Sequence, residues 1–155
     1  RRVMPVLTAD DRRLFEIVAE KVSEGFPGIE IEFKPAGMAL VHDEGHPAAD
    51  ALVALARSVV GKAFQVMPGR VAIDIVPPGV DKGHALAAFM ERRPCVGRVP
   101  VHVGDDVPDE AAFRAAEVAG GYGVTVGRAA LGVTRTLPDH DAVWVMLERY
   151  AEIHL

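Results

Sequence analysis

The chain has 155 residues, of which half are apolar and a quarter charged, and its formal net charge is −5 at neutral pH. This composition is typical of a folded globular protein, and without a Lys/Arg block the sequence offers no patch for nucleic acid or anionic membranes. No apolar run is long enough to span a membrane, and the first six residues lack the pattern of a targeting peptide. Because Cys95 is the only cysteine, we expect a reducing, cytoplasmic setting and a small-molecule or metal-ion ligand.

The first half of the chain alternates helical and hairpin patterns. Apolar residues recur at helical spacing between Thr8 and Gly25, and again from Ala48 to Gly61, where glycine is a plausible helix stop. The hairpins that follow these helices are expected at 29–34 with 38–41 and at 64–67 with 71–76. Residues 1–78 therefore predict an α+β lobe in which helices pack on one face of an antiparallel sheet.

The second half alternates helix and strand. The expected elements are a helix at 81–93, a strand at 99–103, a helix at 108–118, a strand at 123–126 and a closing helix at 142–153. This order is typical of a parallel, three-layer α/β domain. Only two or three strands can be counted, fewer than the ~5–6 of an average sheet, so residues 79–155 have the pattern of half a domain.

The strongest local signal is a group of carboxylates. The apolar segment before Gly104 is followed by Asp105, Asp106 and Asp109, just ahead of a helix. Ligands of open α/β sheets bind beyond the carboxyl ends of the strands, and Mg²⁺ prefers oxygen ligands and needs few carboxylates. The three acids therefore predict a Mg²⁺ site, although loop acids that interact favourably with the dipole of the next helix are an alternative.

Lys82 is a second candidate, in the first turn of the helix expected at 81–93. Its charge opposes the helix macrodipole there, at a cost of ~0.3–1 kcal/mol, so helix stability does not explain its position. Close to a metal ion and a phosphate, a lysine would orient a carboxylate and balance the charge of the phosphoryl group. The alternative is an exposed lysine with a mild cost.

Together these segments resemble a known family. Val80-Asp81-Lys82-Gly83, followed further along by Gly104-Asp105-Asp106 and then by Asp109-Glu110-x-x-Phe113, is similar to the third and fourth motifs of haloacid-dehalogenase-type phosphatases. The fourth motif has the form found in the trehalose-6-phosphate phosphatase branch, with Pro108 where Thr is usual.

The first lobe is similar to the cap of the same branch. The resemblance rests on Glu32-x-Lys34, on His42, and on Arg70 followed by Asp74. It implies that Glu32, Lys34, His42 and Arg70 contact the sugar, whereas solvated strand and loop positions are the alternative. His42 falls one residue later than in the family, acidic residues stand where an arginine follows it, and Asp74 stands where Glu is usual.

The resemblance implies a haloacid-dehalogenase-like α/β fold. Residues 1–78 would form the substrate-specificity cap, and residues 79–155 the C-terminal half of a three-layer Rossmann-like core. It further implies a Mg²⁺-dependent phosphatase that hydrolyses trehalose 6-phosphate through an aspartyl phosphate, with Lys82 as the catalytic lysine and the three acids as metal ligands.

The family's first two motifs do not occur in these residues. Asp139-His140-Asp141 has the spacing of the nucleophile motif, Asp-x-Asp-Gly-Thr, but Ala142-Val143 follows it, and the segment has the pattern of a helix start. We therefore expect this chain alone to be inactive. Two alternatives stay open: a phosphatase for another sugar, such as sucrose phosphate or mannosyl-phosphoglycerate, and a non-catalytic sugar-phosphate sensor or partner domain of a synthase.

Overall fold

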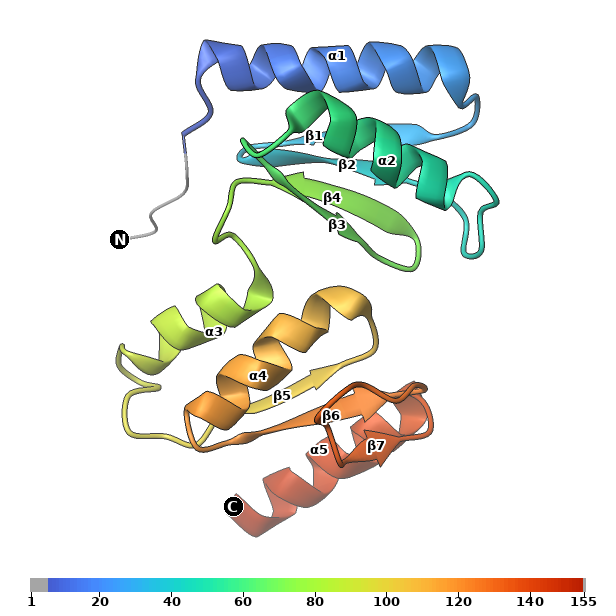
Figure 1. Cartoon of the computed structure of the whole chain (residues 1–155). Helices are drawn as coiled ribbons and strands as arrows, with labels where there is room; N and C mark the ends of the chain where they lie inside the picture. The colour runs from blue at the N-terminus through green and yellow to red at the C-terminus, as the bar shows by residue number, and fades with distance from the viewer. Residues whose placement is uncertain (1–5, 155) are drawn as a thin grey trace. The chain divides into compact units, whose positions relative to one another are not determined.

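The computed structural model describes residues 6–154, which fall into two compact units (Figure 1). The first unit ends at Val80 and the second begins at Asp81, two residues beyond the expected end of the first lobe at Pro78. Residues 1–5, which belong to the segment without a targeting pattern, and residue 155 lie outside the described part of the chain.

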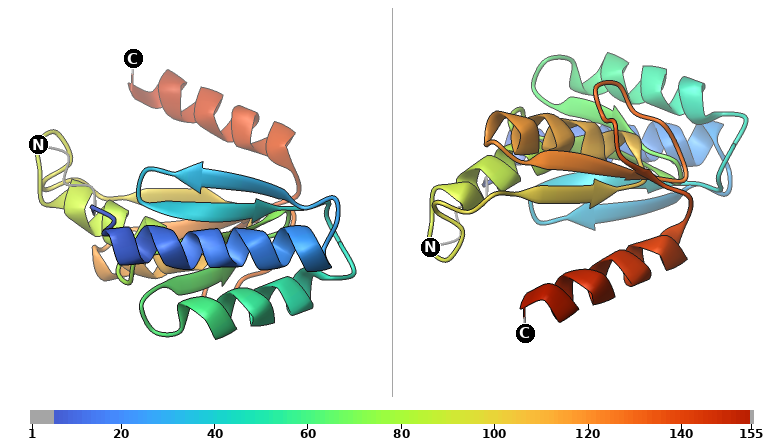
Figure 2. Two further views of the ribbon diagram at one scale, coloured as in Figure 1. Left: turned by 90° about the horizontal axis from the view of Figure 1, so that it is seen from above. Right: turned by 90° about the horizontal axis from the view of Figure 1, so that it is seen from below.

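The first unit is an α+β lobe. Its described elements are α1 (Ala9–Gly25), β1 (Glu30–Lys34), β2 (Gly37–Val41), α2 (Ala49–Val60), β3 (Gln65–Pro68) and β4 (Ala72–Val76). The strands form an antiparallel sheet in the order β1-β2-β4-β3. Both helices cover the same face of this sheet, as Figures 1 and 2 show from two directions. The order of elements and the one-sided packing agree with the sequence pattern.

Local interactions explain where α1 begins and where α2 ends. The Thr8 hydroxyl accepts a hydrogen bond from the Asp11 amide at 3.1 Å, and the Asp11 carboxylate accepts one from the Thr8 amide at 2.8 Å. This reciprocal pair is a capping box that satisfies backbone donors at the start of α1. Helix α2 is followed by Gly61, whose φ of +56° lies in the left-handed region that glycine adopts without strain.

The core of the first unit lies between the sheet and its two helices. Its most buried side chains are Phe15, Val18 and Val22 of α1, Leu52 and Ala56 of α2, Met38 and Leu40 of β2, and Ile73 and Ile75 of β4. Because side chains alternate between the faces of a strand, the strand residues adjacent to these core positions point to the other face of the sheet.

The opposite face of the sheet is polar. Ile73 of β4 lies in the core, so the adjacent Asp74 points to the other face. Ile31 of β1 also packs on the core side, so Glu32 and Lys34 lie on the same face as Asp74. The sheet therefore presents these charged side chains away from its helices.

The second unit has the expected parallel α/β arrangement. Its described elements are α3 (Lys82–Met90), β5 (Val101–Gly104), the 3₁₀-helix η1 (Val107–Asp109), α4 (Glu110–Val118), β6 (Tyr122–Val126), β7 (Thr136–Leu137) and α5 (His140–His154). The strands are parallel, in the order β5-β6-β7. Helices α4 and α5 lie on opposite faces of this sheet (Figure 2).

The main differences from the sequence expectation in the second unit concern the end of α3, the turn before α4 and the last strand. Helix α3 ends at Met90 and does not reach Arg93, because Pro94 has no amide hydrogen and restricts the residue before it. The turn before α4 is a 3₁₀-helix that Asp106 caps. Strand β7 was not expected, because two residues are too few to show an alternating pattern. Among the described helices, none is both long and apolar enough to cross a membrane.

Candidate active site

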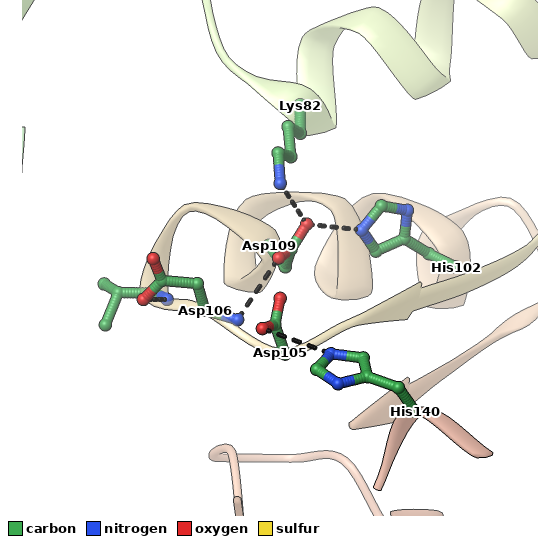
Figure 3. Close-up of polar contacts among 7 residues, drawn as sticks. Lys82, His102, Asp105, Asp106, Asp109 and His140 are labelled. Carbon is green, nitrogen blue, oxygen red and sulfur yellow. Dashed lines mark hydrogen bonds and ion pairs between the residues drawn. The ribbon is translucent and has the colours of Figure 1, made fainter. Parts of the chain in front are cut away.

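The acids that follow β5 lie at the carboxyl end of that strand. The strand ends at Gly104, Asp105 and Asp106 follow, and η1 turns the chain so that Asp109 lies beside the strand end (Figure 3). A methyl group on Gly104 would collide with the side chain of Asp109. The glycine therefore permits the close approach of this carboxylate to the strand.

Asp109 is a buried carboxylate that receives three hydrogen bonds. Its side chain is 4% exposed. Lys82 Nζ lies 2.6 Å from Oδ1, His102 Nε2 lies 2.9 Å from the same oxygen, and the amide of Asp106 donates to Oδ2 at 3.3 Å. Burial alone would raise the pKa of Asp109, but the hydrogen bonds from Lys82 and His102 and the charge of Lys82 hold it below its ordinary value.

Lys82 reaches this carboxylate from the first residue of α3. The start of that helix is fixed by Asp81, whose carboxylate accepts a hydrogen bond from the His84 amide at 2.8 Å. Lys82 is half exposed, in contrast to its partner. Its ammonium group is therefore anchored on a buried acid while it remains accessible to a ligand.

The other two acids have different surroundings. An oxygen of the half-buried Asp105, Oδ2, lies 3.6 Å from Nε2 of His140, at the start of α5. Asp106 caps η1, and its Oδ1 accepts a hydrogen bond from the Val107 amide at 2.7 Å. The three predicted metal-binding acids thus share one loop, but the carboxylate of Asp109 is directed at protein donors.

The fit of this loop to a metal ion rests on its oxygen donors. Within residues 6–154, no group of three or more His, Cys, Asp or Glu side chains is arranged to hold a metal ion. Proteins bind Mg²⁺ through only one or two carboxylates, together with waters and substrate phosphates. The carboxylates of Asp105 and Asp106 fit that requirement, whereas a site made of protein ligands alone would need more donors.

In the first unit, charged residues meet on the polar face of the sheet. Lys34 Nζ lies 2.8 Å from Asp74 Oδ1 and 3.9 Å from Glu32 Oε2. Ala39 of β2 pairs with both Glu32 and Asp74, and its small side chain lets Lys34 reach across β2. Asp74 was not predicted as a sugar contact, although its position between Ile73 and Ile75 would have placed it on this face.

The other two predicted cap contacts lie elsewhere. The amide of His42 donates to the carbonyl of Val71 at 2.9 Å, which continues the β2–β4 pairing by one residue. His42 therefore points to the face opposite Lys34, and it is only 8% exposed; a shift of one residue along a strand changes the face. Arg70 lies in the β3–β4 turn, where its Nε is 3.6 Å from Glu44 Oε1.

Two histidines of the core site were not predicted. His102 occupies the middle of β5 and contacts Asp109, and His140 begins α5 and contacts Asp105. The position of His102 between Val101 and Val103, in an otherwise apolar strand, could have indicated that it belongs to the site. His140 gave no comparable signal, because its contact depends on how α5 packs.

Known structures identify the fold. The C-terminal domain of C. albicans trehalose-6-phosphate phosphatase superposes with a TM-score of 0.75 at 20% identity, covering 91% of this chain and 60% of that one. A haloacid dehalogenase-like hydrolase from Bacteroides thetaiotaomicron superposes with a TM-score of 0.51 at 21% identity, covering 76% and 45% of the two chains. The fold is that of the haloacid-dehalogenase-like phosphatases, with a cap and part of a Rossmann-like core, which confirms the predicted fold class.

Sequence comparison identifies the family. The trehalose-phosphatase family model matches residues 13–136. The trehalose-6-phosphate phosphatase of Escherichia coli (strain K12) is 35% identical over 125 residues, which are 79% of this chain and 47% of that protein. The chain belongs to the trehalose-phosphatase family, as its motifs predicted, and spans about half the length of the curated relatives it matches.

Proposed function

We propose that the protein containing this chain is a Mg²⁺-dependent phosphatase that hydrolyses trehalose 6-phosphate to trehalose and phosphate. The observation that carries this proposal is the pair of Lys82 and buried Asp109 at the carboxyl end of β5. This is the position at which open α/β sheets bind their ligands. The family of the chain supports the choice of substrate.

The residues of the core have distinct proposed roles. Lys82 binds the phosphoryl group and balances its negative charge, and Asp109 holds Lys82 in place. Asp105 and Asp106 are the proposed Mg²⁺ ligands, and a bound Mg²⁺ would neutralise charge on the phosphoryl oxygens. Because Asp109 already accepts three hydrogen bonds, we assign it to the support of this site.

The nucleophile is proposed to come from outside these 155 residues. The first aspartate of an Asp-x-Asp-Gly-Thr motif would attack phosphorus and form an aspartyl phosphate. The second would give a proton to the departing sugar oxygen and then take one from the water that hydrolyses the intermediate. This chain spans about half the length of its family relatives. The whole protein can therefore contain such a segment.

The polar face of the first unit is proposed to bind the sugar. The charged groups of Glu32, Lys34 and Asp74 suit a ligand rich in hydroxyl groups, and a site that hydrogen-bonds hydroxyls rejects ligands that lack them. Arg70 remains a proposed contact at the edge of this sheet, whereas the burial of His42 favours a packing role. We propose a cytoplasmic enzyme whose partner is a sugar phosphate rather than nucleic acid or a membrane.

The metal assignment is tested with Asp105→Ala in the whole protein. We expect loss of Mg²⁺-dependent phosphate release from trehalose 6-phosphate, because the oxygen donor nearest to the strand end is removed. Glu117→Ala removes an exposed acid of α4 and is expected to leave the rate unchanged. Retained activity in Asp105→Ala would exclude Asp105 from the site.

The substrate is tested with a panel of sugar phosphates. Asp74 stands where the family usually has Glu, so sucrose 6-phosphate and mannosyl-phosphoglycerate belong in the panel. Preference for either would replace the proposed substrate with a related one. No release from any member would favour the non-catalytic alternative.

A further inference from the structure

His102 is a polar residue in a strand that is otherwise apolar. It lies in β5 between Val101 and Val103, and its side chain is 20% exposed. Its Nε2 lies 2.9 Å from the same Asp109 oxygen that binds Lys82 (Figure 3). Both donors thus share Oδ1 of a carboxylate that is almost fully buried.

The orientation of the His102 ring is fixed by packing. The ring meets Phe113 of α4 edge to face, with ring centroids 5.4 Å apart and an angle of 64° between the planes. Phe113 is itself buried, and it occupies the space beside Gly123, which pairs with His102 in the sheet. A methyl group on Gly123 would come within 2.7 Å of the Phe113 ring. Gly123 of the neighbouring strand β6 therefore leaves room for Phe113, whose ring orients His102.

This geometry determines the proton on the imidazole. The Asp109 side chain is a carboxylate paired with an ammonium group, and carboxylate oxygens only accept hydrogen bonds. His102 Nε2 must then carry a hydrogen and donate it. The carboxylate is held at Oδ1 by His102 and at Oδ2 by the Asp106 amide, so its rotation is restricted from both sides.

We propose that His102 is a positioning residue for Lys82. It fixes the Asp109 carboxylate, and through it the ammonium group at the end of a flexible four-carbon side chain. The inference deepens the proposed function, since it assumes that Lys82 binds the phosphoryl group. The competing explanation is that His102 only fills space between β5 and α4.

Two substitutions separate these explanations. His102→Phe keeps a ring of similar shape against Phe113 but removes the donor. His102→Gln loses the ring but places an amide N–H about as far from the backbone as Nε2. A space-filling role predicts that Phe is the better replacement, whereas a positioning role predicts that Gln is.

The first measurement uses the 155-residue chain and does not depend on activity. The ¹H–¹⁵N signal of the Lys82 ammonium group, assigned by its loss in Lys82→Arg, reports whether that group is held. We expect the signal in the wild type and in His102→Gln and its loss in His102→Phe, with thermal midpoints recorded for all three. A signal that persists in His102→Phe, is lost equally in both variants or is absent from the wild type would overturn the proposal.

A measurement on the wild type covers the case in which a variant does not fold. The ring nitrogens of His102 have separate ¹⁵N shifts, which identify the protonated nitrogen. The proposal requires hydrogen on Nε2, and a ring protonated only on Nδ1 would overturn it.

Kinetics of the whole protein supply the functional readout. For His102→Phe we expect kcat to fall roughly tenfold, the lower end of the effects of residues that orient a site, with KM nearly unchanged and recovery in His102→Gln. Unchanged kcat in His102→Phe would contradict the proposal. A wild type without phosphatase activity would refute the proposed function, while the Lys82 signal would still decide the role of His102.

Discussion

At Asp109, burial of a carboxylate and the nearness of an ammonium group act on the pKa in opposite directions. The hydrogen bonds from Lys82 and His102 and the Lys82 charge prevail, so the pKa is lower in the folded protein than in the unfolded chain. The charged form therefore stabilises the fold. This contribution is complete above the unfolded carboxyl pKa of about 4 and disappears as pH falls through the folded pKa.

Asp109→Asn is the variant that tests this balance. We expect its free energy of unfolding to be about 1.5–3 kcal/mol below that of the wild type near neutral pH, the range for hydrogen bonds to charged groups. The difference should shrink in acid, because the wild type then loses the same contribution. Urea unfolding over a series of pH values measures it, with the exposed Asp141→Asn as control. A difference that does not change with pH would contradict the account of Asp109.

At the scale of the elements, the alternation of side chains along strands β1, β2 and β4 separates the proposed sugar contacts from packing residues. Lys34 and Asp74 form an ion pair on the polar face, and His42 lies buried on the other. Neighbouring residues of a strand point to opposite faces, so a change of one position along β2 moves a side chain from one face of the sheet to the other. The two faces should therefore respond to different measurements.

The paired variants Lys34→Ala and His42→Ala test this division. For Lys34→Ala we expect a higher KM for the sugar phosphate and little change in thermal midpoint, because its ion pair is partly exposed. For His42→Ala we expect a loss of about 1–2 kcal/mol in stability with KM unchanged. Lys62→Ala, an exposed lysine of the same unit, is the control. A higher KM in His42→Ala would instead support a contact between His42 and the sugar.

The order of elements could be predicted because most of them have a clear hydrophobic period. The end of α3 and strand β7 could not be placed from the sequence. A hydrophobic period needs several residues to be recognised, whereas the effect of Pro94 and the pairing of β7 each involve only one or two. Motif spacing was sufficient to propose Lys82 and Asp105 as site residues, and their roles stay a prediction. The contact of Lys82 with Asp109 joins residues 27 positions apart, so the anchoring role of Asp109 needed the fold.

At the scale of the whole molecule, the two units have unequal cores. The buried cluster of the first unit draws on both helices and three strands, whereas the buried apolar residues of the second are Ala112, Phe113, Ala116, Val124 and Val126. Helix α5 exposes large apolar side chains, including Trp144 and Ile153. Fewer buried apolar side chains therefore stabilise the second unit than the first.

Amide hydrogen exchange of the chain tests this inequality. We expect the slowest exchange in β2 and β4, whose side chains form the centre of the larger core, and faster exchange in β5 and β6. Equal protection of the two sheets would show that the second unit is as stable as the first. It would contradict the account of unequal cores.

The central claim is most directly tested by phosphate release from trehalose 6-phosphate by the whole protein that contains this chain. The assay compares Mg²⁺ with a chelator and trehalose 6-phosphate with sucrose 6-phosphate. We predict release that requires Mg²⁺ and strongly prefers trehalose 6-phosphate. Absence of release, or release that is unaffected by removal of Mg²⁺, would contradict the account.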